Sequence, residues 1–276
     1  MRGLFWLKVL VLSTVFCFCI GNPAIAGRLV IKGSTTVLPI AQRAAEEFMK
    51  INPDLKISVS GGGSGNGIKA IIDGTTDIAD ASRFMKDKEI QLAMKKGVLP
   101  VPHRVALDCV VPVVHPSNPL KKVTMDQLKD IYTGKIRRWK ELGGPNKPIV
   151  VISRDTSSGT YEVWHKKVLK KEKVTPKALL QASNGAVVQA VANNKYAIGY
   201  IGIGYLSKSV KALKVNDVEA SATTALNGTY PISRPLFMFT NGWPKGDIIS
   251  FINFLLSPTG QKIVQEEGYV PLYPVK

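Results

Sequence analysis

The chain has 276 residues, 45% of them hydrophobic, and carries 37 lysine and arginine residues against 20 aspartate and glutamate residues. This composition is that of an ordinary globular protein, without a low-complexity tract or a clear repeat. The formal net charge of +17 creates a field that attracts anions, although a basic surface that only aids solubility is the alternative. Nucleic acid is not expected as a partner, because the lysine clusters at 166–177 and 207–214 lack interleaved stacking aromatic residues.

The first 26 residues, 1–26, have the pattern of a cleavable signal peptide. Arg2 and Lys8 form a basic start, and the apolar run at 9–20 is too short to span a bilayer dependably. Ala24 and Ala26 then supply the small residues that precede a cleavage point. The pattern predicts cleavage after Ala26 and an exported, periplasmic protein.

The cysteines indicate a fold without disulfides. Cys17 and Cys19 lie inside the apolar run of the signal peptide, behind bulky residues, so a lipid anchor is not expected. Only Cys109 remains after cleavage, and the fold must therefore rest on its hydrophobic core. Cys109 lies in the apolar run VALDCVVPVV, where a buried and inert thiol is expected.

The mature chain opens with a strand, a hydroxyl-rich loop and a helix. A short buried strand is expected at 28–33, and Ser34, Thr35 and Thr36 follow it. Apolar residues then recur at helical spacing over 37–48, which predicts an amphipathic helix. Serine or threonine is the preferred residue at the start of such a helix.

The same order of elements occurs twice more. In the second unit, a strand at 56–61 leads through a glycine-rich turn at 62–67 to apolar residues at helical spacing over 68–72. In the third, a strand at 148–154 leads through DTSSG to a helical pattern over 161–169. Alternating short apolar strands and helices predict an α/β fold with largely parallel sheets.

Two further strands bracket the middle of the chain and suggest two lobes. They are expected at 105–114 and 235–240, and a closing helical segment follows at 247–265. If both strands cross between lobes, the first lobe is discontinuous in sequence. The expected boundaries are 27–106 with 232–276 for lobe I and 107–231 for lobe II.

The starts of the predicted helices are candidate anion sites. A helix N-terminus exposes unpaired N–H groups and about half a positive charge, glycine lets the backbone approach a ligand, and hydroxyl groups add donors. In α/β sheets, ligands collect at the carboxyl ends of strands, where these loops lie. A single such start is ordinarily only a cap, but several together indicate a shared anion site. The candidates are Ser34–Thr36, Ser64–Gly67, Ser158–Thr160 with Arg154 before it, and Ser82 with Arg83.

Other functional motifs are missing. The run 62–69 lacks the GK[ST] of a nucleotide-binding P-loop, and only a weak GxGxxA fragment remains at 65–70. There is no GxSxG, no HExxH and no clustered cysteine and histidine spacing. The sequence therefore predicts neither a catalytic residue nor a metal site nor a cofactor, and no enzyme.

Several segments together resemble one family. GSTTVLP, SGGGSGNGIKAI, DIADASR, DQLKDIYTGKIRRWKELGG, ISRDTSSGTYEVW and SNGAVVQAV–AIGYIG closely resemble the phosphate-binding proteins of bacterial phosphate ABC importers, in the same order along the mature chain. The resemblance implies a two-lobed periplasmic-binding-protein fold of type II with two crossover strands. It also implies a monomer that closes on one inorganic phosphate and delivers it to membrane permease subunits.

The resemblance also implies which residues bind phosphate. The R-x-x-x-S-G-T motif of the family falls on Arg154, Ser158, Gly159 and Thr160. The serine of its glycine loop falls on Ser64. The first loop falls on the segment with Ser34, Thr35 and Thr36, which is one residue longer than in some relatives, so any of the three is a candidate.

One departure bears on selectivity. Where some relatives carry an aspartate that accepts the proton of hydrogen phosphate, this chain has Ser82 followed by Arg83. Arg83 favours any dianion, and Asp80 is a candidate acceptor. Binding of another tetrahedral oxyanion such as sulfate therefore stays open. A secreted phosphoryl hydrolase and a basic surface protein without a small ligand are the alternatives from other classes.

Overall fold

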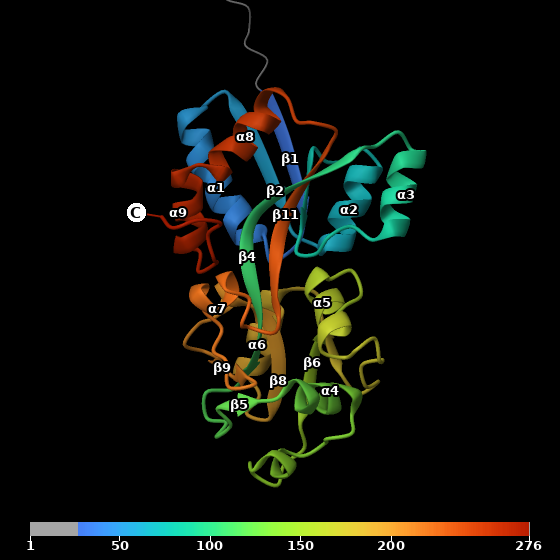
Figure 1. Ribbon diagram of the computed structural model, residues 1–276, viewed down its shortest axis with the longest axis vertical. Helices are drawn as coiled ribbons and strands as arrows, with labels where there is room; N and C mark the ends of the chain where they lie inside the picture. Colours follow the sequence, from blue (N-terminus) through green and yellow to red (C-terminus); the bar gives the residue numbers. More distant parts are fainter. Residues whose placement is uncertain (1–26, 276) are drawn as a thin grey trace, which may run out of the picture.

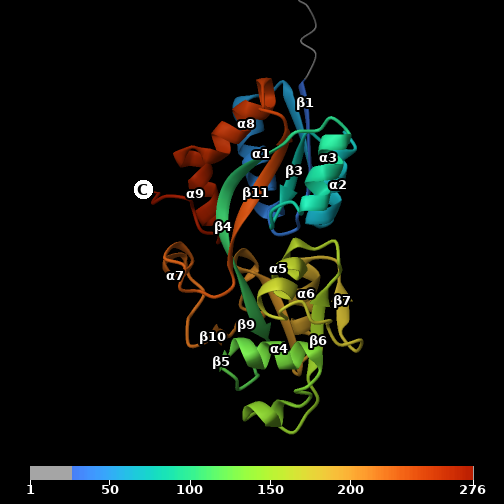
Figure 2. The same ribbon diagram turned by 45° about the vertical axis from the view of Figure 1, so that its right-hand side comes forward.

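The computed structural model describes residues 27–275, so the expected signal peptide, with Cys17 and Cys19, lies outside the described residues. Two α/β lobes lie one above the other along the longest axis, and two long strands, β4 and β11, run side by side from one lobe into the other (Figure 1). A view turned by 45° shows the same two strands crossing the waist of the molecule (Figure 2). The expected α/β fold with two lobes and two crossover strands is confirmed.

Lobe I is the upper lobe in Figure 1, and its elements come from both ends of the described chain. They are β1 (Gly27–Gly33), α1 (Leu38–Ile51), β2 (Leu55–Ser60), α2 (Ser64–Ile72), β3 (Ile78–Ala81), α3 (Asp87–Lys95), α8 (Gly246–Leu256) and α9 (Pro258–Glu266). The crossing strands are β4 (Pro100–Val114) and β11 (Ser233–Asn241).

Lobe II is built from the middle of the chain. Its helices are α4 (Met125–Thr133), α5 (Gly159–Lys167), α6 (Asn184–Ala192) and α7 (Ala222–Leu226), with short 3-10 turns at Trp139–Leu142 and Ile203–Tyr205. Its strands are β5 (Lys122–Val123), β6 (Val150–Arg154), β7 (Leu179–Gln181), β8 (Ala197–Gly202), β9 (Lys211–Ala212) and β10 (Lys214–Val215).

One continuous sheet links the lobes, with the strand order β2-β1-β3-β11-β4-β8-β6-β7. The outer strands are parallel within each lobe, and β11 and β4 pair antiparallel with each other and with their neighbours in the middle. In a parallel group the carboxyl ends of the strands meet at one edge. The loops after β1, β2 and β3 therefore share one edge of lobe I, and the loop after β6 faces them from lobe II.

Each lobe has its own apolar core. In α1 the buried residues are Ile40, Ala41, Ala44, Ala45 and Phe48, the face that the helical spacing predicts. In lobe II the rings of Trp164 and Tyr200 stack with centroids 4.2 Å apart. Cys109 is fully buried, as expected, and burial raises the pKa of its thiol to about 12. None of the helices in residues 27–275 combines the length and apolarity that a bilayer crossing requires.

The structure corrects two expectations. The closing segment at 247–265 is two helices rather than one, because Pro258 lacks an N–H and forces the preceding Ser257 out of the helical region, to ψ 167°. The Ser257 hydroxyl then accepts from Gly260 N at 3.3 Å and starts α9. The start of α1 also differs, since Val37 stands at its N-cap and no side chain caps the helix.

Candidate functional site

The predicted anion-binding residues meet between the two lobes. Each of them is buried, and they come from the loops after β1, β2, β3 and β6. Buried polar groups at this density need partners, because an unpaired buried donor or acceptor costs about 1–3 kcal/mol. The predicted anion-binding residues that meet here are Ser34, Thr35, Thr36, Ser64, Ser82, Arg83, Arg154, Ser158, Gly159 and Thr160.

The first loop, after β1, makes hydrogen bonds across the lobe interface. Thr36 Oγ1 lies 3.0 Å from Thr160 Oγ1 of the opposite lobe, within hydrogen-bond distance. Thr35 Oγ1 accepts from Arg154 Nη2 at 3.3 Å, also from lobe II. The Ser34 hydroxyl is used locally, since it accepts from Thr36 N at 3.1 Å. The loop therefore presents two threonine hydroxyls to the other lobe.

The glycine-rich loop after β2 places Ser64 beside Ser82 of lobe I and Gly159 of lobe II. Ser64 Oγ accepts from Ser82 N at 3.0 Å and lies 3.3 Å from Ser82 Oγ, which ties α2 to the end of β3. A Cβ at Gly159 would collide with both hydroxyl oxygens, so only glycine fits there. At Gly63 the φ of 101° is in the left-handed region that favours glycine. The glycines thus allow the two lobes to approach.

Arg154 stands at the end of β6 and is 1% exposed. Its Nε donates to Gln181 O at 3.0 Å and its Nη2 donates to Ala182 O at 2.9 Å, which fixes the guanidinium in the site. Its Nη1 is buried and has no hydrogen-bond partner among the described residues. Burial is the largest influence on its pKa and lowers it from the usual value. Arg154 thus has donor capacity that its own lobe does not use.

Arg83 is held differently from Arg154. Its Nη1 and Nη2 each donate to one carboxylate oxygen of Glu89 at 2.8 Å, and Nη1 also donates to Phe84 O at 2.9 Å. Glu89 accepts in addition from Lys86 N at the start of α3. Burial raises the pKa of Glu89, but the hydrogen bonds and charges of Arg83 and Lys86 together outweigh it, and the pKa is lowered. Arg83 is therefore a bound member of an ion pair at the site's border.

The structure adds an ion pair that sequence reasoning missed. Arg234 on β11 and Asp108 on β4 are both buried, and Arg234 Nε and Nη2 lie 2.8 and 2.7 Å from Asp108 Oδ2. Arg234 Nη2 also donates to the Oγ1 atoms of Thr36 at 3.2 Å and Thr160 at 3.0 Å. A crossover strand thus links hydroxyl groups of both lobes.

Asn184, the first residue of α6, was also missed. Its side-chain amide donates to Thr35 Oγ1 at 3.2 Å and to Thr36 Oγ1 at 3.1 Å. Two features of the sequence could have identified Asn184 and the pair of Asp108 and Arg234. Asn184 lies within the SNG segment that carries the family resemblance, and Asp108 and Arg234 are single charges in strands that read as buried, where charges are paired.

The hydrogen-bond donors around Thr35 and Thr36 determine which groups the site can offer to a ligand. Thr36 Oγ1 accepts from Asn184 and Arg234, so its acceptor capacity is largely filled and its proton is left to donate. Helix starts and Arg154 add further donors. Groups of three or more metal-binding side chains do not occur within residues 27–275. The site is suited to hold a buried anion through hydrogen bonds, since a buried charge is tolerated only when it is paired.

The lobes are in contact around this site. Gly65 N donates to Ser157 O at 2.9 Å, and Ser157 Oγ donates to Gly62 O at 3.2 Å. Lys86 of lobe I and Glu162 of lobe II form an ion pair at 2.7 Å. The structure is therefore in a closed form. A closed two-lobed α/β protein with a donor-lined site between its lobes has the architecture of a solute-binding protein.

Comparison with known proteins agrees with this class. The sequence model of the PBP superfamily domain matches residues 21–259. The phosphate-binding protein PstS of Bacillus subtilis (strain 168) is 34% identical over 258 residues, which cover 93% of this chain and 84% of that protein. The chain therefore belongs to the PstS family of phosphate-binding proteins within the PBP superfamily.

Solved structures are similar as well. One is a putative phosphate ABC transporter substrate-binding protein with bound phosphate from Clostridium perfringens, with 38% identity and a TM-score of 0.85 over 90% of this chain and 100% of that one. Another is an ABC-type phosphate transport receptor from Vibrio cholerae, with 32% identity and a TM-score of 0.73 over 89% of this chain and 100% of that one.

Proposed function

We propose that this protein binds inorganic phosphate between its lobes and delivers it to the permease subunits of an ABC importer. The observation that carries the proposal is the buried Nη1 of Arg154, which has no partner among the described residues. A buried guanidinium N–H without a partner is costly, and a phosphate oxygen would satisfy it. The names of the relatives, which are phosphate-binding proteins, support the choice of anion.

In this mechanism phosphate exchanges its water shell for protein donors. Lobe I would supply Ser34–Thr36, Ser64 and Ser82, and lobe II would supply Arg154 and Ser158–Thr160. Arg83 would act through its charge at the border of the site, because Glu89 already occupies its guanidinium. Contacts from both lobes exist only in the closed form, so the ligand shifts the equilibrium between open and closed forms towards closure.

The remaining expectations join this proposal. The protein would act in the periplasm as a monomer after cleavage behind Ala26, would not bind nucleic acid and would not be an enzyme. Its lobes would divide at the boundaries expected from the sequence, with 107–231 as lobe II. The similarity to phosphate-binding transport proteins does not favour a sulfate binder or a phosphoryl hydrolase.

Calorimetric titration of refolded, phosphate-free protein with phosphate and with sulfate tests the proposal. We expect a single site for phosphate and much weaker binding of sulfate. An absence of phosphate binding would overturn the proposal, and equal affinity for both anions would overturn its selectivity. Slow turnover of a phosphomonoester, lost in Thr160→Val, would support the hydrolase instead.

A further inference from the structure

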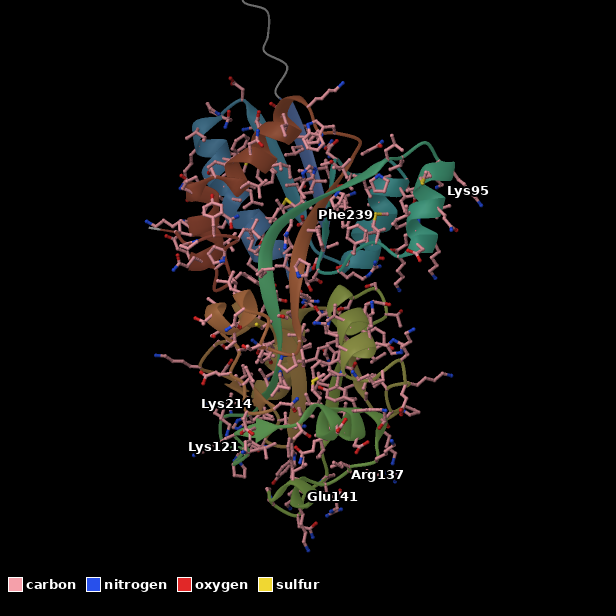
Figure 3. The ribbon with its side chains drawn as sticks, in the orientation of Figure 1. Lys95, Lys121, Arg137, Glu141, Lys214 and Phe239 are labelled. Carbon is pink, nitrogen blue, oxygen red and sulfur yellow. The ribbon has the colours of Figure 1, made fainter. Side chains whose placement is uncertain are left out.

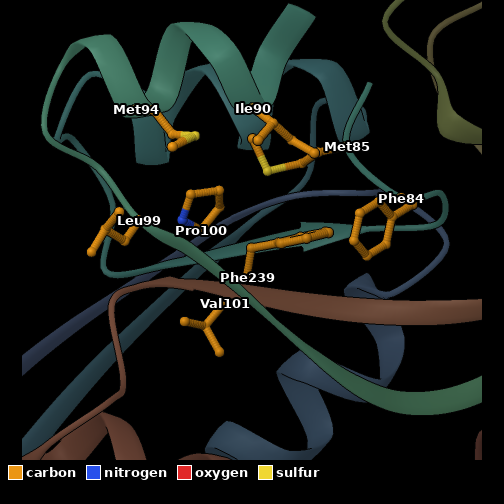
Figure 4. A pocket seen from close by; sticks show the side chains of 8 residues that line it. All are labelled: Phe84, Met85, Ile90, Met94, Leu99, Pro100, Val101 and Phe239. Atoms are coloured by element: carbon orange, nitrogen blue, oxygen red, sulfur yellow. The ribbon is translucent and has the colours of Figure 1, made fainter. Parts of the chain in front are cut away.

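An apolar patch lies on lobe I, beside α3 and the segment that follows Arg83. Its members are Phe84, Met94 and Leu99, with exposed fractions of 50%, 60% and 60%. Between α3 and the crossing strands, side chains such as Phe84, Met94 and Leu99 surround an apolar cavity of about 250 Å³ (Figure 4). Phe239 of β11 forms its floor, and Figure 3 labels this residue where the crossing strands lie in lobe I, with Lys95 at the end of α3.

A basic groove continues from this patch across the seam between the lobes. The groove has a volume of about 720 Å³, and Phe84 lines both it and the apolar cavity. Two carboxylates, of Asp87 and Glu162, stand against a larger number of cationic side chains in its lining. The cationic residues are Arg83, Lys86, Lys166, Lys167, Lys171 and Arg234. Arg83, Lys86 and Arg234 are already paired with carboxylates, whereas Lys166, Lys167 and Lys171 form no ion pair among the described residues.

The groove exists only when the lobes are together. One wall is the segment 84–87 of lobe I, and the other is α5 of lobe II with the loop that follows it. Lys86 and Glu162 join the walls through their 2.7 Å ion pair. Separation of the lobes would move the lysines of α5 away from the apolar patch. The arrangement of both features side by side is thus a property of the closed form.

We propose that the apolar patch and the basic groove form one docking surface for an extracytoplasmic segment of the membrane transporter. This inference rests on the proposed function. The transporter segment that would fit the surface presents an apolar side chain next to carboxylates. Clustered exposed apolar residues mark interaction sites, and the three lysines that form no ion pair among the described residues, Lys166, Lys167 and Lys171, favour an acidic partner. Because the surface spans both lobes, such a segment would distinguish the closed protein from the open one.

The test uses the phosphate ABC importer of the same organism, purified and reconstituted in nanodiscs, and measures binding by interferometry at saturating phosphate. The double variant Met94→Ser with Leu99→Ser should weaken binding by about tenfold or more, since exposed apolar anchors dominate interface affinity. The matched control, Ile51→Ser with Leu180→Ser, removes two apolar side chains that are 66% and 61% exposed elsewhere. It should stay within about twofold of the parent protein.

A second pair of variants tests the charge. Lys166→Glu with Lys171→Glu should weaken binding and reduce its dependence on salt, whereas reversal of the exposed Lys56 and Lys140 should not. Equal losses in variants and controls would overturn the proposal. So would unchanged transporter binding together with lost binding to phosphatidylglycerol vesicles, which would make the surface a membrane contact.

Phosphate titration separates this proposal from the function on which it rests. All four double variants should bind phosphate with the affinity of the parent protein, because none of the substituted residues touches the site. Retained phosphate binding with retained transporter binding in the Met94 and Leu99 variant overturns the docking surface alone. If the parent protein does not bind phosphate, the proposed function itself fails.

Discussion

The ends of β3 and β6 each carry an arginine near a serine hydroxyl, Ser82 or Ser158, yet they use charge differently. At the end of β3, Glu89 takes both terminal nitrogens of Arg83, and burial raises the pKa of Asp80 well above its usual value. At the end of β6, Arg154 keeps one buried nitrogen without a partner among the described residues. A position beside the cleft is therefore not enough for an arginine to bind the anion. At least one of its N–H groups must also have no hydrogen-bond partner in the protein.

Arg154→Ala should have the largest effect on phosphate binding. Removal of one partner of a buried, hydrogen-bonded charge pair costs about 2–5 kcal/mol, so we expect affinity to fall by about 30-fold or more. Calorimetric titration would measure it. Arg137→Ala is the matched control, because Arg137 is an exposed arginine far down lobe II (Figure 3). Similar affinities in both variants would show that the unpaired nitrogen of Arg154 does not bind the anion.

Thr160→Val should follow with a loss of about tenfold, the size expected for one hydroxyl that contacts a buried anion. The substitution keeps the shape of the side chain but removes the group that lies 3.0 Å from both Thr36 Oγ1 and Arg234 Nη2. Thr160→Ser restores a hydroxyl and should recover most of the affinity. Failure of the serine to recover it would point to packing rather than hydrogen bonding.

Arg83→Ala should change phosphate affinity by less than about threefold, because the charge lies at the border of the site and is already paired. It should instead destabilise the fold by about 2 kcal/mol, since the half-buried Glu89 carboxylate loses its partner. Titration and chemical denaturation would give the two numbers. A loss of affinity as large as that of Arg154→Ala would mean that Arg83 leaves Glu89 and binds the anion.

Much of the fold follows from spacing along the chain. The strands and helices at 28–48, 56–72 and 148–169 could be predicted because each alternates a short apolar strand with apolar residues at helical spacing. Their helix starts pointed to the site because the carboxyl ends of parallel strands meet at one edge. The break between α8 and α9 also had a local cause, Pro258, which was outweighed by the apolar pattern around it.

Pairings between distant segments could not be predicted in this way. Arg234 and Asp108 lie 126 positions apart, and only the antiparallel register of β11 and β4 brings them together. The pairing of Arg83 with Glu89 also depends on tertiary position, although Glu89 three residues after Lys86 is a local signal for a helix start. Partner choice among buried charges is thus the part of the site that sequence left open.

Asp80→Asn should have the smallest effect on binding and should sharpen the contrast between the two strand ends. Both carboxylate oxygens of Asp80 are buried without a partner among the described residues, and burial raises its pKa well above 3.8. The folded state therefore holds the proton more tightly than the unfolded state, so stability from this group falls as pH rises above about 4. Asparagine cannot ionise, so Asp80→Asn should not lose free energy of unfolding as the pH rises.

We therefore expect Asp80→Asn to be more stable than the parent protein at pH 7.5, by about 1 kcal/mol, with the difference vanishing near pH 4. Denaturant unfolding at both pH values would measure it. The control is Asp77→Asn, three residues before Asp80. Asp77 Oδ2 accepts a hydrogen bond from Val30 N at 2.7 Å, so its substitution should cost stability. If Asp80→Asn weakens phosphate binding but not sulfate binding, Asp80 accepts the phosphate proton, and the end of β3 supplies selectivity while the end of β6 supplies charge.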